Sequence, residues 1–493
     1  MKPRTVPTVH APLPTALPGR FRFDPADVRR FAAAGKPFLY LASSSAVVGL
    51  EEPAAAALEA LEGGLRGLED LSAALAPRFG AEAAAGALGE LLLFGVVAPA
   101  DEPPAPFPKG PSASFPLATV VLNVTNRCNL ACKYCYEYGE DRFVPPTRAR
   151  QMSDEVARRA VDLLIEKSGP RRQVTVTFFG GETLLNFEVV RRTVAYARAR
   201  THEVGKAVDF SLTTNATLLT PEAIDFLAEN RIGVSVSIDG PKELHDRMRV
   251  DHAGRGSYDR LIGKVRELLA KHRSRPIGAR VTLTSEVNDV PAIYRHLVGE
   301  VGFAEVGFAP VTSAPGRPYA LEGEALARLL DDFGALAAAY RDAALRGERH
   351  GFANLSDLLT EIHQGVAKSH PCGAGLGLLG VAPDGTVALC HRFAESEKHT
   401  LGDVFRGIDD AARFDFLARA GVANKPVCQQ CWARGLCAGG CYHEAMVRYG
   451  EATRANLHYC DWIRAWTEMG LRTYAEIAEK NPAFLGTLEA RKA

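Results

Sequence analysis

The feature that most constrains this chain is a group of three cysteines directly after a run of β-forming residues. Cys128, Cys132 and Cys135 have the spacing C-x3-C-x2-C within the segment VVLNVTNRCNLACKYCYEYGED. Three thiolates at the end of a strand can hold three corners of a four-iron cluster and leave the fourth iron open. Buried structural cysteines have no reason to keep this spacing, and a zinc site would usually supply a fourth Cys or His nearby.

Charge and hydropathy exclude several classes of partner. Lys plus Arg and Asp plus Glu both number 58, so no basic excess indicates a nucleic acid or a bilayer surface. The N-terminus has no apolar segment of signal-peptide length, and no run of about 18 apolar residues occurs. We therefore expect a cytoplasmic protein with no nucleic-acid or membrane partner, whose ten cysteines are metal ligands rather than disulfides.

The length of 493 residues suggests two to four domains. The expected divisions are a flexible N-terminus at 1–20, a winged-helix unit at 21–98, a proline-rich linker at 99–116, an α/β core at 117–315, a helical bridge at 316–370, a cysteine-rich domain at 371–465, and a C-terminal helix and tail at 466–493.

The winged-helix expectation comes from short strand-like runs at Phe38–Ser43 and Ser45–Glu51, three helical patterns, and a final strand-like FGVV. This pattern resembles the leader-peptide recognition domains of ribosomal peptide maturation systems. The resemblance implies that the stretch Phe38–Glu51 forms an exposed sheet edge, to which a peptide adds as a further strand. A dimerisation or stabilising domain is the alternative. DNA binding is disfavoured because the later helices carry few Lys or Arg.

The central region alternates strand and helix. Strands are expected at 119–125, 174–179, 209–214, 234–238, 279–284 and 305–309, with helices between them at 153–167, 187–199, 221–229, 257–272 and 290–301. This order predicts an α/β fold with a parallel sheet, either a partial (β/α)6 barrel or an open doubly wound sheet. In both folds the ligand site lies at the C-terminal strand ends, where Cys128 falls.

Other conspicuous residues follow successive strands at the same edge: Gly180, Gly181 and Glu182, then Thr214 and Asn215, then Ser237 and Asp239. A Gly-Gly pair lets backbone approach a ligand closely, while hydroxyls and carboxylates can bind a ribose or an ammonium group. Together they predict one binding site.

The remaining seven cysteines lie in the last quarter of the chain: Cys372, Cys390, Cys428, Cys431, Cys437, Cys441 and Cys460. The segment APDGTVALC predicts a β-hairpin with Asp384-Gly385 at its turn and Cys390 on the returning strand. A zinc ribbon is the alternative for the C-x2-C part. Seven thiolates, however, exceed the needs of one tetrahedral zinc.

The C-x3-C-x2-C motif with Tyr134 before its last cysteine, the GGE segment and the SIDGP segment resemble the radical S-adenosylmethionine (SAM) enzymes. The resemblance implies that a four-iron cluster on the first three cysteines binds SAM and, after reduction, splits it to a radical. It also implies that Gly180, Gly181 and Glu182 contact the amino group of SAM, that Ser237 and Asp239 lie near its ribose or carboxylate, and that Tyr134 lies near its adenine. Asn215 is a further expected SAM contact.

The seven later cysteines resemble the SPASM domain, which binds two auxiliary four-iron clusters. That resemblance implies three clusters in all, with Cys428, Cys431, Cys437 and Cys460 holding one auxiliary cluster and Cys372, Cys390 and Cys441 the other. The second set lacks a fourth cysteine, which leaves an open iron unless His370 or His391 fills the position.

The layout is similar to that of the maturases that form thioethers in the small subunit of quinohemoprotein amine dehydrogenase. We therefore predict a radical SAM enzyme that joins a substrate Cys to the methylene of Asp or Glu in a peptide or small protein with a leader segment, with flavodoxin or ferredoxin as electron donor. Alternatives are formylglycine formation, as in sulfatase maturases, carbon-carbon crosslinking, and a peptide-binding scaffold with structural clusters. In sulfatase maturases an Asp follows the cysteine that corresponds to Cys390, whereas this chain has His391.

Overall fold

The computed structural model describes residues 16–103, 107, 110–111, 113–137, 141–142 and 150–489. Most of the predicted flexible N-terminus and parts of the predicted linker lie outside these residues. Within them the largest sheet has ten strands, in the order β11-β10-β9-β8-β7-β6-β12-β13-β14-β15.

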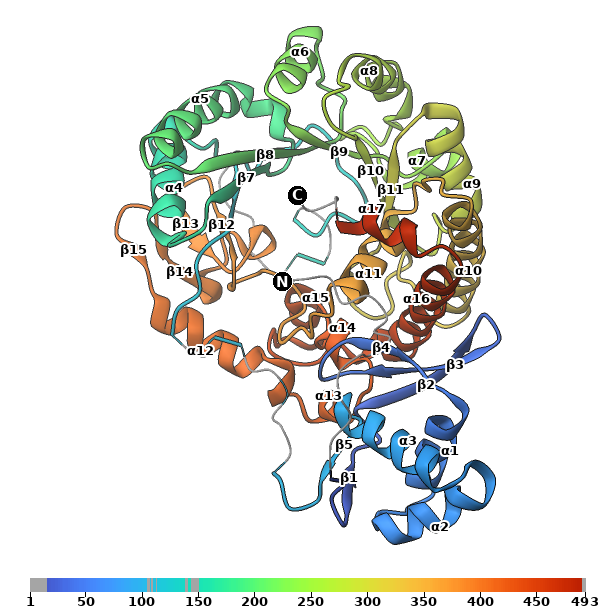
Figure 1. The fold of residues 1–493 in the computed structure, drawn as a ribbon. Coiled ribbons are helices and arrows are strands. Elements are labelled where there is room, and N and C mark those ends of the chain that lie inside the picture. The colour runs from blue at the N-terminus through green and yellow to red at the C-terminus, as the bar shows by residue number, and fades with distance from the viewer. Residues whose placement is uncertain are drawn as a thin grey trace.

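Six parallel strands form the first part of this sheet, and all six were predicted. They are β6 (Thr119–Asn123), β7 (Gln173–Phe179), β8 (Ala207–Thr214), β9 (Gly233–Ser237), β10 (Gly278–Leu283) and β11 (Glu305–Pro310). The sheet curves around a central space, with its helices on the outer side (Figure 1). The α/β class is confirmed.

The outer helices are α4 (Asp154–Lys167), α5 (Phe187–Glu203), α6 (Pro221–Glu229), α7 (Lys242–Met248), α8 (Tyr258–Lys271), α9 (Val290–Tyr294) and the π-helical turn η2 (Arg295–Val301). Ser153 and Thr220 begin α4 and α6 as side-chain caps, accepting hydrogen bonds from the backbone N–H of Val156 and Ala223. The sequence reading missed α7, because seven residues span too few turns for a clear apolar period.

Alternation along the strands makes the outer face of the sheet apolar and its inner face polar. In β9, Val234 and Val236 are buried in the core, while Ser235 and Ser237 face an internal cavity. In β10, Val281 is buried and Arg280 faces the same cavity. Because side chains in a strand point to opposite faces in turn, this pattern places polar groups inside the curved sheet.

A hairpin of β12 (Leu378–Val381) and β13 (Thr386–Ala388) extends the sheet, and β12 pairs in parallel with β6. The predicted turn at Asp384-Gly385 is present, but Cys390 is not on the returning strand. It lies two residues past β13, at the start of the short helix η3 (His391–Phe393). A Cβ on Gly380 would come within 2.4 Å of the Cys390 carbonyl carbon, so glycine permits this close packing.

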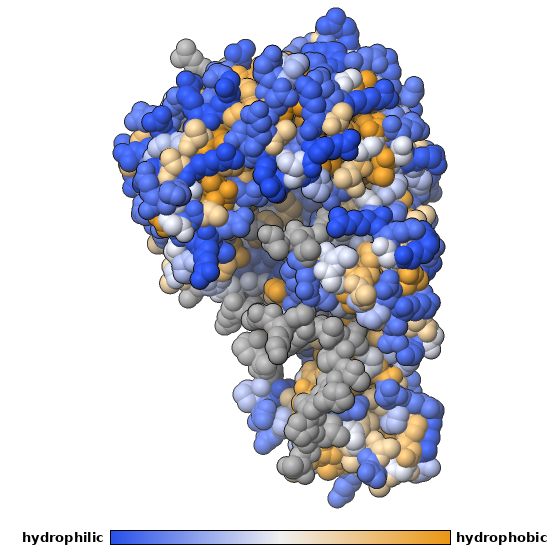
Figure 2. All heavy atoms as spheres, turned by 45° about the horizontal axis from the view of Figure 1, so that its top comes forward, coloured by the Kyte–Doolittle hydropathy of each residue, from blue (hydrophilic) through white to orange (hydrophobic). Residues whose placement is uncertain are grey.

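The remaining C-terminal elements are β14 (Thr400–Asp403), β15 (Gly407–Ile408), the helices α10 (Glu324–Leu345), α11 (Ala353–Gln364), α12 (Asp410–Ala420), α13 (Pro426–Gln429), α14 (Arg434–Cys437), α15 (Tyr442–Tyr449), α16 (Cys460–Lys480) and α17 (Gly486–Glu489), and short 3-10 turns. The C-terminal helix begins at Cys460 rather than at 466. None of the helices in the described residues is long and apolar enough to cross a membrane. Hydrophobic residues on the face in Figure 2 lie in small groups among hydrophilic ones.

The N-terminal unit contains five strands rather than the predicted three. They are β1 (Phe21–Phe23), β2 (Val28–Ala33), β3 (Lys36–Leu41), β4 (Ala46–Gly49) and β5 (Val97–Pro99), with the helices α1 (Glu52–Glu62), α2 (Leu68–Phe79) and α3 (Ala81–Leu93). The sequence reading missed β2 because Arg29 and Arg30 interrupt its hydrophobic pattern. Since β3 lies between β2 and β4, only β4 of the predicted stretch Phe38–Glu51 is at an edge.

The two faces of this small sheet belong to different cores. Leu39 and Leu41 pack with α1 to α3 in a core of their own, whereas Phe38 and Tyr40 join the main core of the chain. The domain boundaries given by the sequence stay predictions. The shared core of Phe38 and Tyr40 joins the N-terminal sheet to the C-terminal part of the chain.

A buried ion pair adds to this contact. Arg434 Nη2 donates to Asp27 Oδ1 at 2.6 Å, and Arg434 Nη1 donates to the Ala26 carbonyl at 2.5 Å. The two charged side chains are only 8% and 15% exposed. Removing one partner would leave the other charge buried without compensation.

We predict that Arg434→Met destabilises the docking of the N-terminal unit by about 3–5 kcal/mol, the cost of breaking a buried pair. Thermal denaturation should show the loss, and limited proteolysis should cut faster between the N-terminal unit and the sheet. The matched control is Arg419→Met, which removes an exposed pair with Asp415 and should change stability by less than about 1 kcal/mol. Equal effects of the two substitutions would contradict this assignment.

Candidate functional site

A cavity of about 570 Å³ lies inside the curved sheet at the C-terminal ends of its strands. Nine of the ten residues predicted for the first site line it: Cys128, Cys132, Tyr134, Cys135, Gly180, Gly181, Glu182, Asn215 and Ser237. They come from the loops after β6, β7 and β8 and from the end of β9, as expected for parallel strands that end at one edge.

Asp239, the tenth predicted residue, is not among the residues that line the cavity. Its side chain is fully buried and accepts hydrogen bonds from the Tyr134 hydroxyl at 2.5 Å and from Arg249 Nε at 2.8 Å. The backbone N–H of Thr282 donates to its other oxygen at 2.9 Å. The carboxylate of Asp239 therefore holds Tyr134 and Arg249, and its predicted place near SAM stays a prediction.

The loop that carries the three cysteines is held by the segment after α7. The backbone N–H of Ala131 donates to the Val250 carbonyl at 2.8 Å, and that of Lys133 donates to the Met248 carbonyl at 3.0 Å. His252 Nε2 lies 3.1 Å from the Cys128 carbonyl oxygen. The loop is thus paired by its backbone with residues more than a hundred positions later in the chain.

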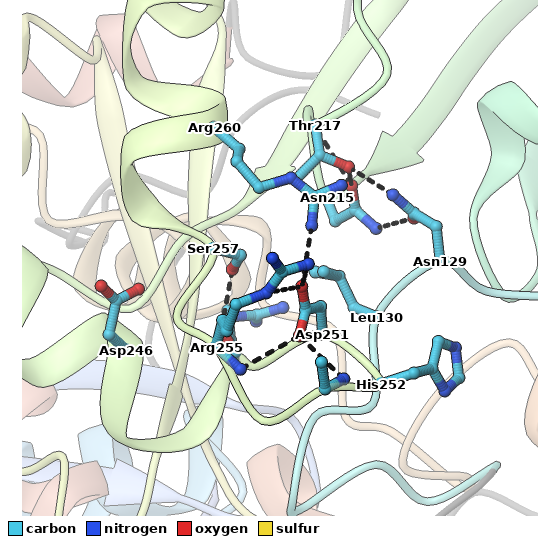
Figure 3. Close-up of polar contacts among 12 residues, drawn as sticks. Asn129, Leu130, Asn215, Thr217, Asp246, Asp251, His252, Arg255, Ser257 and Arg260 are labelled. Carbon is cyan, nitrogen blue, oxygen red and sulfur yellow. Dashed lines mark hydrogen bonds and ion pairs between the residues drawn. The ribbon is translucent and has the colours of Figure 1, made fainter.

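Amide and hydroxyl groups fix the start of the same loop. Asn129 Nδ2 donates to Thr217 Oγ1 at 2.8 Å, and Asn215 Nδ2 donates to Asn129 Oδ1 at 3.0 Å. Thr217 Oγ1 donates in turn to Asn215 Oδ1 at 2.6 Å, which closes a ring of three side chains (Figure 3). Asn215 therefore positions the cysteine loop in addition to lining the cavity.

Gly180 lets the loop after β7 approach the cysteine loop. Its φ is +136°, and a Cβ there would lie 2.3 Å from the Thr125 carbonyl oxygen. The next two N–H groups, of Gly181 and Glu182, donate to the carbonyls of Thr125 at 2.9 Å and Arg127 at 2.8 Å. Only glycine allows this approach, because any side chain would clash with the backbone.

Glu182 is buried at the cavity wall with its carboxylate fixed. It accepts hydrogen bonds from Thr214 Oγ1 at 2.6 Å and from the backbone N–H groups of Asn215 at 2.7 Å and Leu184 at 3.0 Å. Burial raises its pKa, while these three donors oppose the rise. The carboxylate is therefore held in one orientation beside the cavity.

Burial also controls the thiols of the cysteine loop. It raises the pKa of Cys128 to about 12. It raises the pKa of Cys132 as well, where the nearby guanidinium of Arg249 acts in the opposite direction. Metal binding must therefore displace protons from these thiols, and Arg249 favours the thiolate of Cys132.

Sequence reasoning missed several residues that shape the site. Arg249, Arg280 and Arg392 line the cavity, and His245 lies behind it, with its pKa lowered to about 3 by burial. For His245 and Arg249 the available signal was the segment HDRMRVDH, which begins three residues after SIDGP and concentrates charged residues where the topology predicts the site.

A second cavity of about 510 Å³ is lined by six of the seven later cysteines: Cys372, Cys428, Cys431, Cys437, Cys441 and Cys460. All ten cysteines are free thiols. Pro310, at the end of β11, lines both cavities, so the two spaces are neighbours.

The later cysteines fall into two groups. The first group is Cys390 with Cys441 and Cys372. Burial raises the pKa of Cys390 to about 12, and the nearby thiols of Cys441 and Cys372 contribute to the rise.

Four others form the second group: the pKa of Cys428 is raised to about 11 by burial, with contributions from Cys437, Cys460 and Cys431. The two ligand sets themselves stay predictions.

A buried cation lies among the thiols of the second group. Lys425 Nζ is buried without a hydrogen-bond partner in the described part of the chain, close to Cys428 and Cys437. Such a cation suits a site that gains negative charge from thiolates and sulfides.

Residues 122–288 match the family model described as Radical SAM superfamily. The matched segment includes Cys128, Cys132 and Cys135 and is similar to that family. A serine-type anaerobic sulfatase-maturating enzyme of Bacteroides thetaiotaomicron is 35% identical over 243 residues, which are 46% of this chain and 54% of that protein. The chain thus spans about half the length of that relative. A cysteine-type enzyme of the same name from Clostridium perfringens is 26% identical over 341 residues, 66% of this chain and 89% of that protein.

Two solved structures share the fold. Native anSMEcpe with bound AdoMet has a TM-score of 0.62 and 22% identity, over 74% of this chain and 100% of that one. SuiB bound to S-adenosylmethionine has a TM-score of 0.50 and 15% identity, over 89% of this chain and 100% of that one. At these identities the likeness shows a shared fold.

We predict that Asp239→Asn releases the cysteine loop, because the substitution leaves Arg249 buried without its counterion. The free energy of unfolding should fall by about 3–5 kcal/mol, and iodoacetamide should alkylate Cys132 faster in the metal-free protein. Asp259→Asn is the control, since it removes only an exposed pair with Lys242 and should change stability by less than about 1 kcal/mol. Unchanged alkylation of Cys132 in the Asp239 variant would contradict the positioning role.

Proposed function

We propose that the protein uses SAM and three four-iron clusters to form a thioether in a peptide or small protein. The observation that carries this proposal is the shared cavity of Cys128, Cys132, Cys135 and the Gly180–Glu182 segment. Three thiols, a fixed carboxylate and backbone held close by Gly180 surround enough space for a cluster and a cofactor of nucleoside size.

The cysteines would hold three irons, and the bound, reduced cluster with SAM would supply a radical that takes hydrogen from an unactivated carbon. Glu182 would accept hydrogen bonds from the amino group of SAM, since its carboxylate is already oriented. Ser237 offers a hydroxyl to the ribose, and Tyr134 would pack near the adenine. Asp239 would act through Tyr134 and Arg249, whose side chains it holds.

Two auxiliary clusters would occupy the later cysteines, one on Cys428, Cys431, Cys437 and Cys460 and one on Cys372, Cys390 and Cys441. His370 does not suit the eighth position. Its Nδ1 lies 2.9 Å from Ser369 Oγ, and its Nε2 lies 3.0 Å from the Leu417 carbonyl oxygen. His391 lines the first cavity, so the three-cysteine cluster would keep an open iron.

An open iron beside the first cavity would bind a substrate thiolate and lower its pKa. His391 has a buried Nδ1 without a hydrogen-bond partner among the described residues, and burial lowers its pKa to about 3. The imidazole is therefore neutral and can accept the hydrogen bond of a substrate thiol. These features support sulfur chemistry at this end of the cavity.

Formylglycine formation is the second candidate, because two relatives are named sulfatase-maturating enzymes. Against it stands His391 in place of the Asp that follows the corresponding cysteine of that family. A carbon-carbon crosslink would leave the substrate thiol free. These outcomes differ in the mass and the alkylation of the substrate.

Thioether formation should lower the mass of the substrate by about 2 Da per bond and protect one cysteine from alkylation, because a thiol is consumed in the bond. The measurement is intact mass before and after alkylation of the reacted substrate. A mass loss with undiminished alkylation would instead indicate a carbon-carbon bond or an oxidation, and would refute the sulfur chemistry.

Replacing Cys128, Cys132 and Cys135 by Ala should lower the iron content from about twelve to about eight per chain and abolish formation of 5'-deoxyadenosine. The reason is that only the first cluster would bind SAM. The measurements are iron analysis and chromatography after reduction with dithionite. Retained 5'-deoxyadenosine in the triple variant would end the proposal, and a scaffold with structural clusters would form none in the unsubstituted protein.

The N-terminal sheet would bind the leader segment of the substrate along β4. Among the described strands β4 pairs with β3 alone. Just after β4, the backbone N–H of Leu50 points toward β3 and donates to the Pro37 carbonyl at 2.9 Å. Hydrogen-bonding directions alternate along a strand, so the N–H groups of Val47 and Gly49 point outward. They can pair with an added strand.

Gly49→Pro should weaken leader binding by about tenfold or more, because it removes one outward donor and blocks addition of a strand. Fluorescence anisotropy with a labelled substrate peptide measures the affinity. Gly49→Ala is the matched control, since its Cβ meets only the Phe38 ring at an ordinary 3.6 Å, and it should bind normally. Deleting residues 1–105 is a poorer test, because Phe38 and Tyr40 belong to the main core. Normal binding by the proline variant would exclude this edge.

A further inference from the structure

Two arginines line the first cavity without a carboxylate partner in the described part of the chain. Arg280 extends from β10 into the cavity, where solvent reaches it. Arg392 extends from η3, donates from Nη1 to Thr312 Oγ1 at 2.9 Å, and lies over the Tyr136 ring at 4.6 Å. No ion pair of either guanidinium is formed with a described residue. Two positive charges at one cavity wall attract an anion into the cavity.

The two guanidinium groups act on one another. Partial desolvation by the cavity wall lowers the pKa of Arg280, the positive charge of Arg392 lowers it further, and Asp357 in the wall of the second cavity opposes this. Two cations near each other in an enclosed space repel, so an anion that binds between them relieves the repulsion.

Two other charged groups of the cavity are engaged with different partners. Arg249 is matched by Asp239 at 2.8 Å. The carboxylate of Glu182 accepts hydrogen bonds from Thr214, Asn215 and Leu184. Glu137 also lines the wall.

The position of the arginines separates them from the segment expected to contact SAM. Gly180–Glu182 follow β7, whereas Arg280 lies on β10, three places along the sheet. Arg392, on η3, donates a hydrogen bond to Thr312, which follows β11. It lies near the thiols of Cys390 and Cys372, where its charge opposes the rise in pKa that burial causes. The two arginines are therefore on the side of the cavity that faces Cys372, Cys390 and Cys441.

We propose that Arg280 and Arg392 bind the side-chain carboxylate of an Asp or Glu residue of the peptide substrate and so place the adjoining methylene in the cavity. This inference rests on the proposed function, since it specifies which residue type of the substrate carries the reacting carbon. Guanidinium groups bind carboxylates through paired, charge-assisted hydrogen bonds, which fix both the position and the orientation of the side chain.

The same chemistry could serve the carboxylate of SAM, so the test separates the two sources. The probes are N-acetyl-aspartate N-methylamide and its neutral asparagine analogue, titrated into reconstituted full-length protein saturated with SAM and followed by saturation-transfer NMR. The variants are Arg280→Met and Arg392→Met, which keep the length of the side chain and remove its charge. Arg406→Met, at the exposed turn between β14 and β15, is the control. The affinity for SAM is measured in parallel.

We expect wild-type protein and the Arg406 variant to bind the aspartate probe at least about tenfold more tightly than the asparagine probe, and both cavity variants to lose that preference while keeping their affinity for SAM. Equal binding of the two probes by wild-type protein would overturn the proposal, as would binding of neither. Weakened SAM binding with an unchanged aspartate preference would also overturn it and assign the arginines to the cofactor.

Formation of 5'-deoxyadenosine by wild-type protein is recorded in the same samples. Its absence would refute the proposed function itself, whereas its presence with equal probe binding would refute only the role of the arginines.

Discussion

The site depends on one buried ion pair, between Asp239 and Arg249. Asp239 is the point where three parts of the chain meet, because it accepts hydrogen bonds from Tyr134 in the cysteine loop, from Arg249 after α7 and from the backbone of β10. Arg249 in turn lies over the Tyr134 ring at 5.4 Å and near Cys132. A carboxylate with no exposed surface is stable only when its charge is matched and its lone pairs are used. The cysteine loop is held where the strands end because these conditions are met there.

The sequence predicted the sheet well and the N-terminal unit less well, for physical reasons. Six strands such as β7 and β8 carry strong apolar alternation between helices with clear caps, so pattern and propensity agree. The strand β2 was missed because Arg29 pairs with Glu468 on α16 and Arg30 pairs with Glu59 and Glu62 on α1. These partners are distant in sequence, and no local rule identifies them.

The same distinction separates the predicted site residues from the missed ones. Cys128, Gly180 and Glu182 follow strands directly, so topology alone brings them to one edge. Arg280 and Arg392 enter the cavity from the middle of β10 and from η3, where their neighbours depend on the curvature of the sheet and on the closing of its open side. Asp239 also follows a strand, but two of its partners lie on the loop after α7 and on β10, and the order of elements along the chain does not reveal these contacts.

In the proposed reaction, hydrogen is taken from the carbon beside a substrate carboxylate. The most direct test is to supply a substrate deuterated at the methylene of its Asp or Glu side chains and to measure deuterium in the 5'-deoxyadenosine formed. We predict one singly deuterated 5'-deoxyadenosine for each crosslink, because the radical takes the atom that the arginines present. Unlabelled 5'-deoxyadenosine, formed together with modified substrate, would contradict it.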